Sequence, residues 1–457
     1  MGRMDSAMHD LAWDLGARLK AAIAKHRVPG ASIALYAGER LHEAAAGILN
    51  NDTGVEATTD SLFHIASVTK PMTTTIAMQL VDEGKLDLDA TVKHYLPDFR
   101  VASREASERI TVRQLLCHAS GIDGDLFLET TRGEDRVAKL VEAGHVLPQL
   151  HEPGRGFSYC NHGFAVAGRI LEVLDGSDFD TIWRKRLSAK LNAPTLLTLT
   201  RDALRYRVAV GHAGSKNTVP SQIFLGTSAG PAGATPMARA RDLVSVALMH
   251  LNGGVTREGV RVLSEGAVRA MQEPQNPLPA SASAHHFGLG WMLFDWGGHK
   301  IIGHDGLSIF QRSYLRISPD KRMVFSLLTN GGDGVGLFRD LASAFFGEAG
   351  IAITPVMETA KDVRVDVSRF VGTYGRFGST TTVGEKDGAL TMTSGWTADW
   401  ARELWGVQGP FALEPAGNDL FLWRVPAAEP VVVVFVNPDR DGRFSSLYSG
   451  VRLSHRQ

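Results

Sequence analysis

Hydrophobic positions along this chain change their spacing several times, and each spacing predicts a kind of element. The clearest helical run lies between Ser67 and Gly84, where Met72, Ile76 and Leu80 recur four positions apart and the glycine marks a stop. Short or alternating apolar runs bounded by turn residues predict strands instead. We therefore expect helices over 110–118, 161–174, 179–187, 237–252 and 337–348, and strands over 31–37, 42–47, 287–295, 299–302, 308–317 and 323–329.

The order of these elements predicts the fold class. A hairpin comes first, a helical middle follows, and several strands and a last helix close this part; strands and helices that do not alternate favour an α+β fold with an antiparallel sheet flanked by helices. Composition changes near 353–364, and from 370 to 453 short strands are separated by turns, which is typical of a small antiparallel β-barrel. We expect two domains, over 1–352 and 365–457.

Bulk composition narrows the functions that need to be considered. The chain has 457 residues and a formal net charge of -1, which suggests neither a nucleic acid nor an anionic membrane as a partner. Its first 30 residues read as an amphipathic helix without the apolar core of a signal peptide, and no later run is long enough to span a bilayer. Two cysteines and no Cys/His cluster of zinc spacing predict no structural metal and no cofactor. We expect a soluble, cytoplasmic protein.

A serine and a lysine stand at the start of the predicted helix. Lys70 follows Ser67 by three positions, so its ammonium returns to the face that carries the serine hydroxyl. The helix N-terminus adds partial positive charge where an oxyanion would form. Together these are the parts of a covalent acyl-transfer site. Ser-x-x-Lys occurs again at Ser318 and Lys321, in a predicted turn between strands, so the motif alone does not decide.

Tyr159 and Asn161 directly precede the strongest helix of the middle segment. A tyrosine near a lysine ammonium has its phenolate favoured and could take the serine proton. The asparagine amide offers both a donor and an acceptor, and could hold the lysine and a substrate together. The plain alternative is a half-buried tyrosine and an asparagine that caps a helix.

The tripeptide His304-Asp305-Gly306 lies between two strand-like runs, 299–302 and 308–317. Glycine there would let a substrate approach the backbone, and the N–H of Leu307 could join that of Ser67 as an oxyanion donor. A similar tripeptide at His212 falls in a Gly/Ser-rich loop, and we interpret that histidine as a structural residue.

Gly226-Thr227-Ser228-Ala229-Gly230 offers a competing nucleophile, because it matches the Gly-x-Ser-x-Gly elbow of α/β-hydrolases. That elbow needs a strand before it, a helix directly after it and parallel βαβ units. Pro231 and Gly233 follow here, and the later strands are antiparallel. We interpret Ser228 as a loop residue near the site.

The whole set of motifs resembles the serine β-lactamase and penicillin-binding-protein superfamily, and most of all class C β-lactamase-related hydrolases and family VIII carboxylesterases. The resemblance covers roughly 18–350 and rests on the ordered motifs SVTK, YCN and HDG, with LLCHASGI and SAGPAG between them. It implies a β-lactamase/transpeptidase-like sheet with an all-helical subdomain. The tail from FVGTYGRFG onward is similar to the lipocalin-like domain that some relatives carry.

The resemblance also implies roles for individual residues. Ser67 would be the acylated nucleophile, Lys70 would share its proton, Tyr159 would act as general base and then general acid, and Asn161 would position the lysine and the substrate. His304 stands where class C β-lactamases have the lysine of Lys-Thr-Gly, a pattern of esterases and peptidases of this branch, so esters and small amides are expected in preference to β-lactams. Cys117 and Cys160 replace small residues of the family motifs, and we interpret them as buried and structural.

These observations predict a serine hydrolase that cleaves an ester, a small amide or a peptide bond, with weak turnover of β-lactams. Its partner would be a small-molecule or peptide substrate, and self-association stays open. Acyl transfer to an amine or alcohol, as in peptide-cyclising relatives, uses the same acyl-enzyme and is a second hypothesis. A penicillin-recognising sensor without turnover is a third.

Overall fold

The computed structural model describes residues 15–360, 363, 365–397, 401–402, 406–425 and 430–457. The part of the predicted N-terminal helix over 1–14 lies outside them, and 15–25 are helical. A nine-stranded antiparallel sheet forms the centre of the first part, in the order β3-β2-β1-β11-β10-β9-β8-β7-β6. Its strands are β1 (Gly30–Ala37), β2 (Arg40–Asn50), β3 (Val55–Glu56), β6 (Asn276–Pro277), β7 (His286–Phe287), β8 (Met292–Trp296), β9 (His299–Leu307), β10 (Arg312–Ser318) and β11 (Met323–Thr329).

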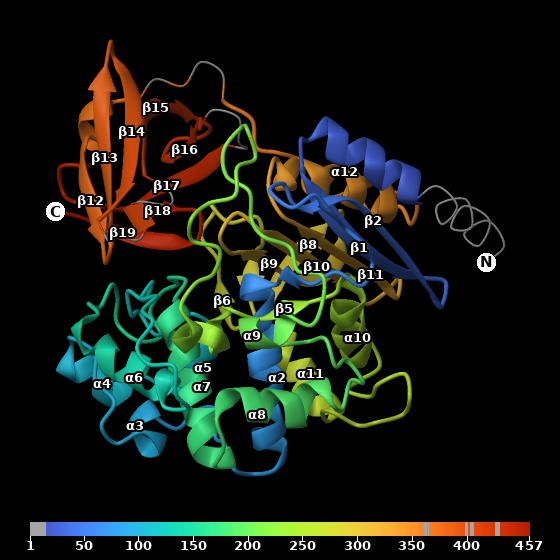
Figure 1. Cartoon of the computed structure of the whole chain (residues 1–457). Coiled ribbons are helices and arrows are strands. Elements are labelled where there is room, and N and C mark those ends of the chain that lie inside the picture. The colour runs from blue at the N-terminus through green and yellow to red at the C-terminus, as the bar shows by residue number, and fades with distance from the viewer. Residues whose placement is uncertain (1–14, 361–362, 364, 398–400, 403–405, 426–429) are drawn as a thin grey trace.

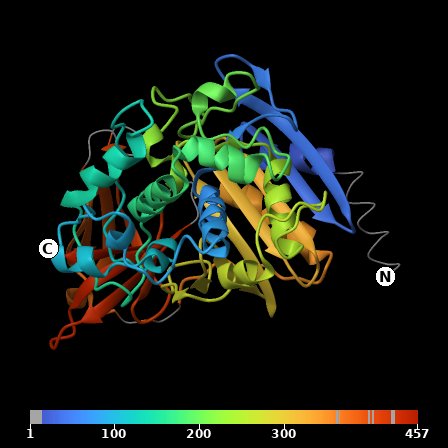
Figure 2. The same cartoon turned by 90° about the horizontal axis from the view of Figure 1, so that it is seen from below.

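Helices cover both faces of this sheet (Figure 1). The 15–25 helix and α12 (Gly334–Gly347) lie together on one face, joined by ion pairs such as that of Lys25 with Asp340. Helices α2 (Thr69–Asp82), α10 (Ala240–Leu251) and α11 (Glu265–Met271) lie on the other face, and α2 runs through the middle of the molecule between the sheet and the remaining helices (Figure 2).

A helical subdomain packs against the far side of α2. It is built around α7 (Asn161–Asp175), which is buried along most of its length and ends at Gly176 in the left-handed region. The other helices here are α3 (Val92–Tyr95), α4 (Arg104–Arg109), α5 (Val112–Leu116), α6 (Arg136–Ala143), α8 (Phe179–Trp183) and α9 (Thr200–Ala203), with the short helical turns η2 (Gly144–Val146), η3 (Arg184–Ser188) and η4 (Thr227–Ala232) and the two-stranded pair β4 (Phe63–His64) and β5 (Met237–Ala238).

The C-terminal part is a closed antiparallel barrel of eight strands, in which β12 pairs with β19 to complete the ring. A cluster of aromatic side chains fills it, with Phe370, Phe421, Phe435 and Phe444 in mutual ring contact. After η5 (Val367–Arg369) its strands are β12 (Gly372–Arg376), β13 (Ser379–Lys386), β14 (Ala389–Trp396), β15 (Val407–Pro415), β16 (Leu420–Trp423), β17 (Val431–Pro438), β18 (Phe444–Ser449) and β19 (Arg452–Arg456).

The α+β class and the small barrel predicted from the sequence are confirmed, and several local predictions are wrong. The 287–295 strand is two strands, because Gly290 turns the chain between β7 and β8 at φ +75°. The 237–252 helix begins only at Ala240, since Met237 and Ala238 pair with β4. The HDG tripeptide does not lie between strands, because β9 continues through it to Leu307.

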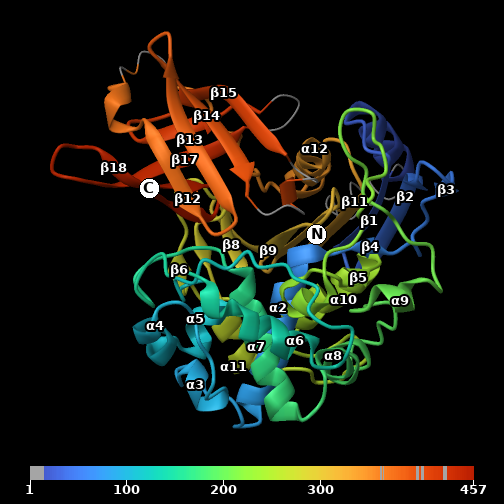
Figure 3. The ribbon, with the colours of Figure 1, turned by 60° about the vertical axis from the view of Figure 1, so that its left-hand side comes forward.

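The barrel rests on the helical subdomain and beside the strand end of β9 (Figure 3). Its β18–β19 hairpin makes the contact: the Tyr159 N–H donates to the Val451 carbonyl at 3.0 Å, and the Tyr448 hydroxyl donates to the Phe157 carbonyl at 2.7 Å. His455 also bonds the Leu150 carbonyl at 2.6 Å. The hairpin thus lies directly against the segment that carries Tyr159.

Candidate active site

Ser67 lies in a tight turn, not in the helix itself. The turn η1 (Ala66–Val68) follows β4, and α2 begins at Thr69. Strand β9 approaches this turn so closely that a Cβ on Gly306 would lie 2.1 Å from Ser313 Oγ and 2.4 Å from the Ile65 carbonyl oxygen. Ser313 Oγ donates to that carbonyl at 2.6 Å. Strands β9 and β10 therefore fix the turn that presents the serine.

Lys70 is fully buried and points at three oxygen atoms. Its Nζ lies 3.0 Å from Ser67 Oγ, 2.7 Å from Asn161 Oδ1 and 2.7 Å from the Ala232 carbonyl. Burial, which strips the ammonium of water, lowers the pKa of Lys70 well below its ordinary value, and the charge of Arg452 lowers it further. Burial at this position therefore disfavours the ammonium relative to a lysine in water.

Tyr159 lies between Lys70 and the barrel. Its phenol is near Ser67, whose hydroxyl lowers the pKa of the phenol. Lys70 Nζ lies 4.8 Å from its ring centroid and the Arg452 guanidinium carbon 5.1 Å. Burial raises the pKa of Tyr159, and this effect outweighs the lowering by Ser67 and Arg452. The phenol therefore keeps its proton, which is opposed to the phenolate that the sequence argument favoured.

His118 packs against the ring of Tyr159. Its ring lies 4.1 Å from the tyrosine ring, and its Nδ1 accepts a hydrogen bond from the Cys160 N–H at 3.0 Å. Burial lowers the pKa of this histidine far below its usual range, so the ring is neutral and Nδ1 is free to accept. The His118 contact holds the backbone between Tyr159 and Asn161.

Asn161 is the first residue of α7, and the N-cap position that the sequence suggested for it belongs to Cys160, whose Sγ accepts from the Gly163 N–H at 3.2 Å. The asparagine amide uses both ends. Its Oδ1 accepts from Lys70, and its Nδ2 donates to Asp125 Oδ1 at 2.7 Å. Asn161 is thus held between a lysine and a buried carboxylate.

Two arginines of the barrel complete the surroundings of Asp125. Arg376 Nη1, from β12, donates to Asp125 Oδ2 at 2.8 Å; Arg452, from β19, donates through Nε to Oδ2 at 2.5 Å and through Nη2 to Oδ1 at 3.1 Å. Although burial alone would raise it, the pKa of Asp125 is lowered because both guanidinium groups favour the carboxylate.

The HDG segment of β9 also lies near Lys70. His304 is buried, its Nδ1 bonds the Asp305 carbonyl at 2.7 Å, and its Nε2 has no partner among the described residues. Burial and the nearby Lys70 lower the pKa of His304 to about 3, so it does not supply the positive charge of a lysine. Leu307 is 55% exposed at the end of β9.

The residues that competed with this site in the sequence, and the two cysteines, lie in other settings. Ser228 is buried and its Oγ bonds Thr130 Oγ1 at 2.8 Å. Ser318 bonds Asp320 at 2.7 Å in the turn after β10. His212 bonds the Asn330 carbonyl and the Asn51 N–H, as a structural histidine does. Cys117 and Cys160 are buried free thiols, and burial raises the pKa of each to about 12.

Sequence reasoning missed Asp125, Arg376, Arg452, the Ala232 carbonyl and the supporting His118. The carbonyl and the histidine lie within SAGPAG and LLCHASGI, two segments that stood out but carried no role. For the two arginines no local pattern exists, because they reach Asp125 only through the docking of the barrel.

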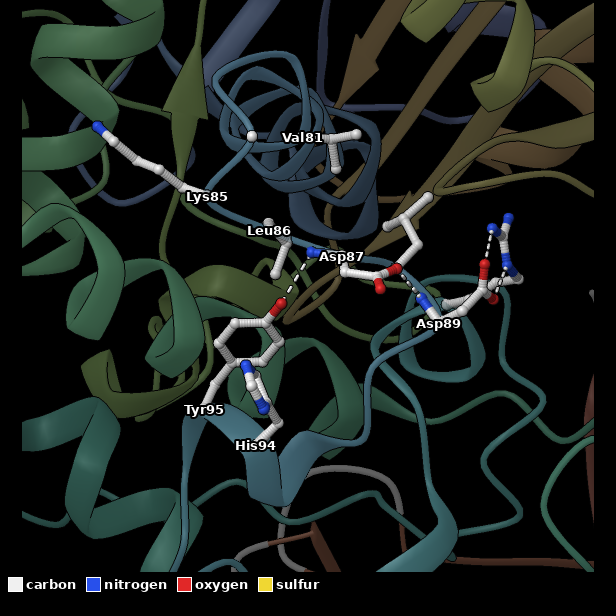
Figure 4. A pocket seen from close by; sticks show the side chains of 10 residues that line it. Val81, Lys85, Leu86, Asp87, Asp89, His94 and Tyr95 are labelled. Atoms are coloured by element: carbon white, nitrogen blue, oxygen red, sulfur yellow. Dashed lines mark hydrogen bonds and ion pairs between the residues drawn. The ribbon is translucent and has the colours of Figure 1, made fainter.

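Other features of the described residues offer no second site of this kind. No group of three or more His, Cys, Asp or Glu side chains in that part of the chain is arranged to hold a metal ion, and no helix there is long and apolar enough to cross a membrane. A surface hollow of about 550 Å³ lies at the C-terminal end of α2, remote from Ser67. Among its polar groups, the Asp87 N–H donates to the Tyr95 hydroxyl and Asp89 is paired with Arg113 (Figure 4).

Comparison with known proteins places this geometry in a family. Residues 15–345 match the family described as Beta-lactamase. The chain belongs to the beta-lactamase family. It is 42% identical over 369 residues to "Penicillin-binding protein 4" of Amycolatopsis lactamdurans, an alignment that covers 79% of this chain and 97% of that protein.

Solved structures of the same fold include one that extends over the barrel. The crystal structure of SurE is 27% identical and superposes with a TM-score of 0.75 over 99% of this chain and 100% of SurE. A D-amino acid amidase from Ochrobactrum anthropi is 22% identical, with a TM-score of 0.62 over 75% of this chain and 99% of its own. This likeness shows a shared fold.

Proposed function

We propose that this member of the beta-lactamase family is a serine hydrolase that forms an acyl-enzyme on Ser67 and cleaves an ester or a small amide or peptide bond. The observation that supports it best is the set of contacts around Lys70. Two of its three oxygen partners, Asn161 Oδ1 and the Ala232 carbonyl, can only accept hydrogen bonds, since the Asn161 amide nitrogen already donates to Asp125.

A neutral lysine amine has two hydrogens and one lone pair. In the proposed reacting state, the two acceptors take these hydrogens and the lone pair faces the Ser67 hydroxyl, whose Oγ lies 3.0 Å from Nζ. Lys70 is therefore the proposed general base, in place of a resting Tyr159 phenolate. As Ser67 Oγ attacks the substrate carbonyl carbon, its proton passes to Lys70 and the carbonyl oxygen gains the negative charge.

Tyr159 is the proposed general acid. Burial raises the pKa of the phenol, which lies near Ser67, so it can protonate the leaving group when the tetrahedral intermediate collapses to the acyl-enzyme. The Lys70 ammonium then returns its proton to the phenolate. Water attacks the acyl-enzyme by the reverse sequence, with the N–H groups of Ser67 and Leu307 as the proposed oxyanion donors.

The comparisons suggest a substrate class. SurE, 26% identical over its whole length in a second structure, was solved with D-Leu, and a relative with 42% identity is named a penicillin-binding protein. We propose amides, esters and peptides with a D-amino acid at the acyl position as the first substrates to test. Transfer of the acyl group to an amine in place of water stays the second candidate, because the acyl-enzyme is the same.

The test is turnover of a matched panel: p-nitrophenyl acetate, the p-nitroanilides of D-Leu and L-Leu, and nitrocefin, each with wild type and Ser67→Ala. We expect turnover that the substitution abolishes, with the D-anilide preferred over the L-anilide. Adding a free amine reports acyl transfer as a new product. Turnover that survives Ser67→Ala would refute the proposal. A covalent adduct on Ser67 with nitrocefin, without turnover of any substrate in the panel, would favour a sensor.

A further inference from the structure

Asp125 joins the barrel to the candidate active site. Its side chain is 1% exposed, and the barrel's Arg376 and Arg452 contact it from one side while Asn161 contacts it from the other. From Asn161 the contacts continue to Lys70 and from there to Ser67. A continuous path of hydrogen bonds thus runs from two strands of the barrel to the serine.

The carboxylate determines which way the Asn161 amide faces. An ionised carboxylate only accepts hydrogen bonds, so the amide must present Nδ2 to Asp125 and Oδ1 to Lys70. The flipped amide would place an oxygen against the carboxylate and a second donor against the amine. Because both arginines keep Asp125 ionised, they also keep this orientation.

The same cluster sets the charge near Lys70. Asp125 favours the ammonium, whereas Arg452 disfavours it and is the larger of the two charge effects after burial. Cys160, His118, His304 and Tyr159 also face the lysine; both histidines are neutral, and the thiol and the phenol keep their protons. Of the groups that face Lys70, the charged ones are therefore Asp125 and the barrel arginine.

We propose that the barrel is a working part of the active site, in which Arg376 and Arg452 are positioning residues that act through Asp125 and Asn161 to orient Lys70. This inference rests on the proposed roles of Ser67 and Lys70. It assigns to the barrel a task in the chemistry that a stabilising appendage would not have.

The experiment measures the second-order rate of Ser67 labelling by a fluorophosphonate from pH 5 to 10 in the full-length protein, with the label located by peptide mass mapping. The rate plotted against pH should rise from an acid limb to a plateau. Arg452→Met removes the charge that disfavours the Lys70 ammonium, so we expect the midpoint of this acid limb to move to higher pH by on the order of one unit. Asp125→Asn removes the charge that favours it, so the limb should move to lower pH, and the plateau should fall by about 10-fold because the amide is no longer oriented.

Two further variants separate this effect from loose docking of the barrel. Tyr448→Phe removes one hydrogen bond of the same interface, to the Phe157 carbonyl, and should leave the pH midpoint of Ser67 labelling unchanged. Arg452→Lys keeps the charge but not the paired contacts to Asp125, and should return the midpoint close to that of wild type with a lower plateau.

The pH midpoints of Ser67 labelling in these variants decide between the inference and its alternatives. Opposite shifts in Arg452→Met and Asp125→Asn, with Tyr448→Phe unmoved, support the inference. If Ser67 is labelled with the same pH midpoint in wild type, Arg452→Met and Asp125→Asn, the inference is overturned and the proposed function still stands. A loss of rate that is equal in Arg452→Met, Asp125→Asn and Tyr448→Phe has the same meaning. Wild type that is not labelled at Ser67 refutes the proposed function and removes the inference with it.

Discussion

A neutral Lys70 should make the stability of this protein depend on pH in a way that a single substitution removes. The lysine is fully buried, and burial lowers its pKa well below the ordinary value. Between its pKa in the folded state and about 10.4 in the unfolded state, the unfolded chain therefore binds one proton that the folded chain does not. The free energy of unfolding then rises with pH by about 1.4 kcal/mol per unit, and this contribution is lost as the pH falls toward the folded pKa.

Lys70→Met removes the titrating group and keeps the shape of the stem. It also leaves Asn161 Oδ1 and the Ala232 carbonyl without their donor, at a cost of roughly 1–3 kcal/mol for each buried acceptor, but that cost does not change with pH. The difference in unfolding free energy, wild type minus variant, should thus grow with a slope of about 1.4 kcal/mol per pH unit inside this window.

The assay is chemical denaturation of both proteins at half-unit steps from pH 6 to 9.5. Lys216→Met, on an exposed loop, is the matched control, and its difference from wild type should be flat. A flat difference for Lys70→Met as well would mean that the buried lysine stays charged, and the assignment of Lys70 as general base would fail.

Substitutions at three further positions test separate parts of the site. Tyr159→Phe should slow hydrolysis of a D-amino acid amide about 10²–10⁴-fold, and that of a p-nitrophenyl ester far less because its leaving group needs no proton; equal losses on the two substrates would remove the general-acid role. Gly306→Ala places a Cβ 2.4 Å from the Ile65 carbonyl oxygen, so kcat should fall and thermal stability drop as β9 moves away from the serine turn, whereas unchanged kinetics would show that this approach is not required. Cys160→Ser keeps an N-cap acceptor for Gly163 and should stay within about 0.5 kcal/mol of wild type, while Cys160→Ala should lose about 1 kcal/mol; thermal melts that rank them the other way would contradict the capping role.

The candidate site was predictable from the sequence where its residues lie in recognisable motifs. The five residues Ser67, Lys70, Tyr159, Asn161 and His304 come from three segments that are far apart in the chain, and the structure brings them together around Lys70. Local spacing misplaced the serine by one turn, because helical periodicity cannot distinguish a short helical turn from the helix that follows it. It also separated HDG from the strand, since glycine and aspartate weaken the strand pattern although β9 continues through them.

What the sequence could not predict depends on packing between distant segments. The pairing of Asp125 with Arg452 needs the barrel to dock against the helical subdomain, and no pattern near either residue encodes that contact. The charge state of Tyr159 has the same origin. Proximity to a lysine favours a phenolate, but burial of both groups lowers the pKa of the lysine and raises that of the phenol.

The most direct test of this account is the mass of the intact protein after brief exposure to benzylpenicillin, followed by peptide mapping. The account predicts a covalent adduct with the mass of the opened β-lactam, located on Ser67 and absent in Ser67→Ala and in Lys70→Met. An adduct on another residue, or one that forms as fast without Lys70, would contradict it.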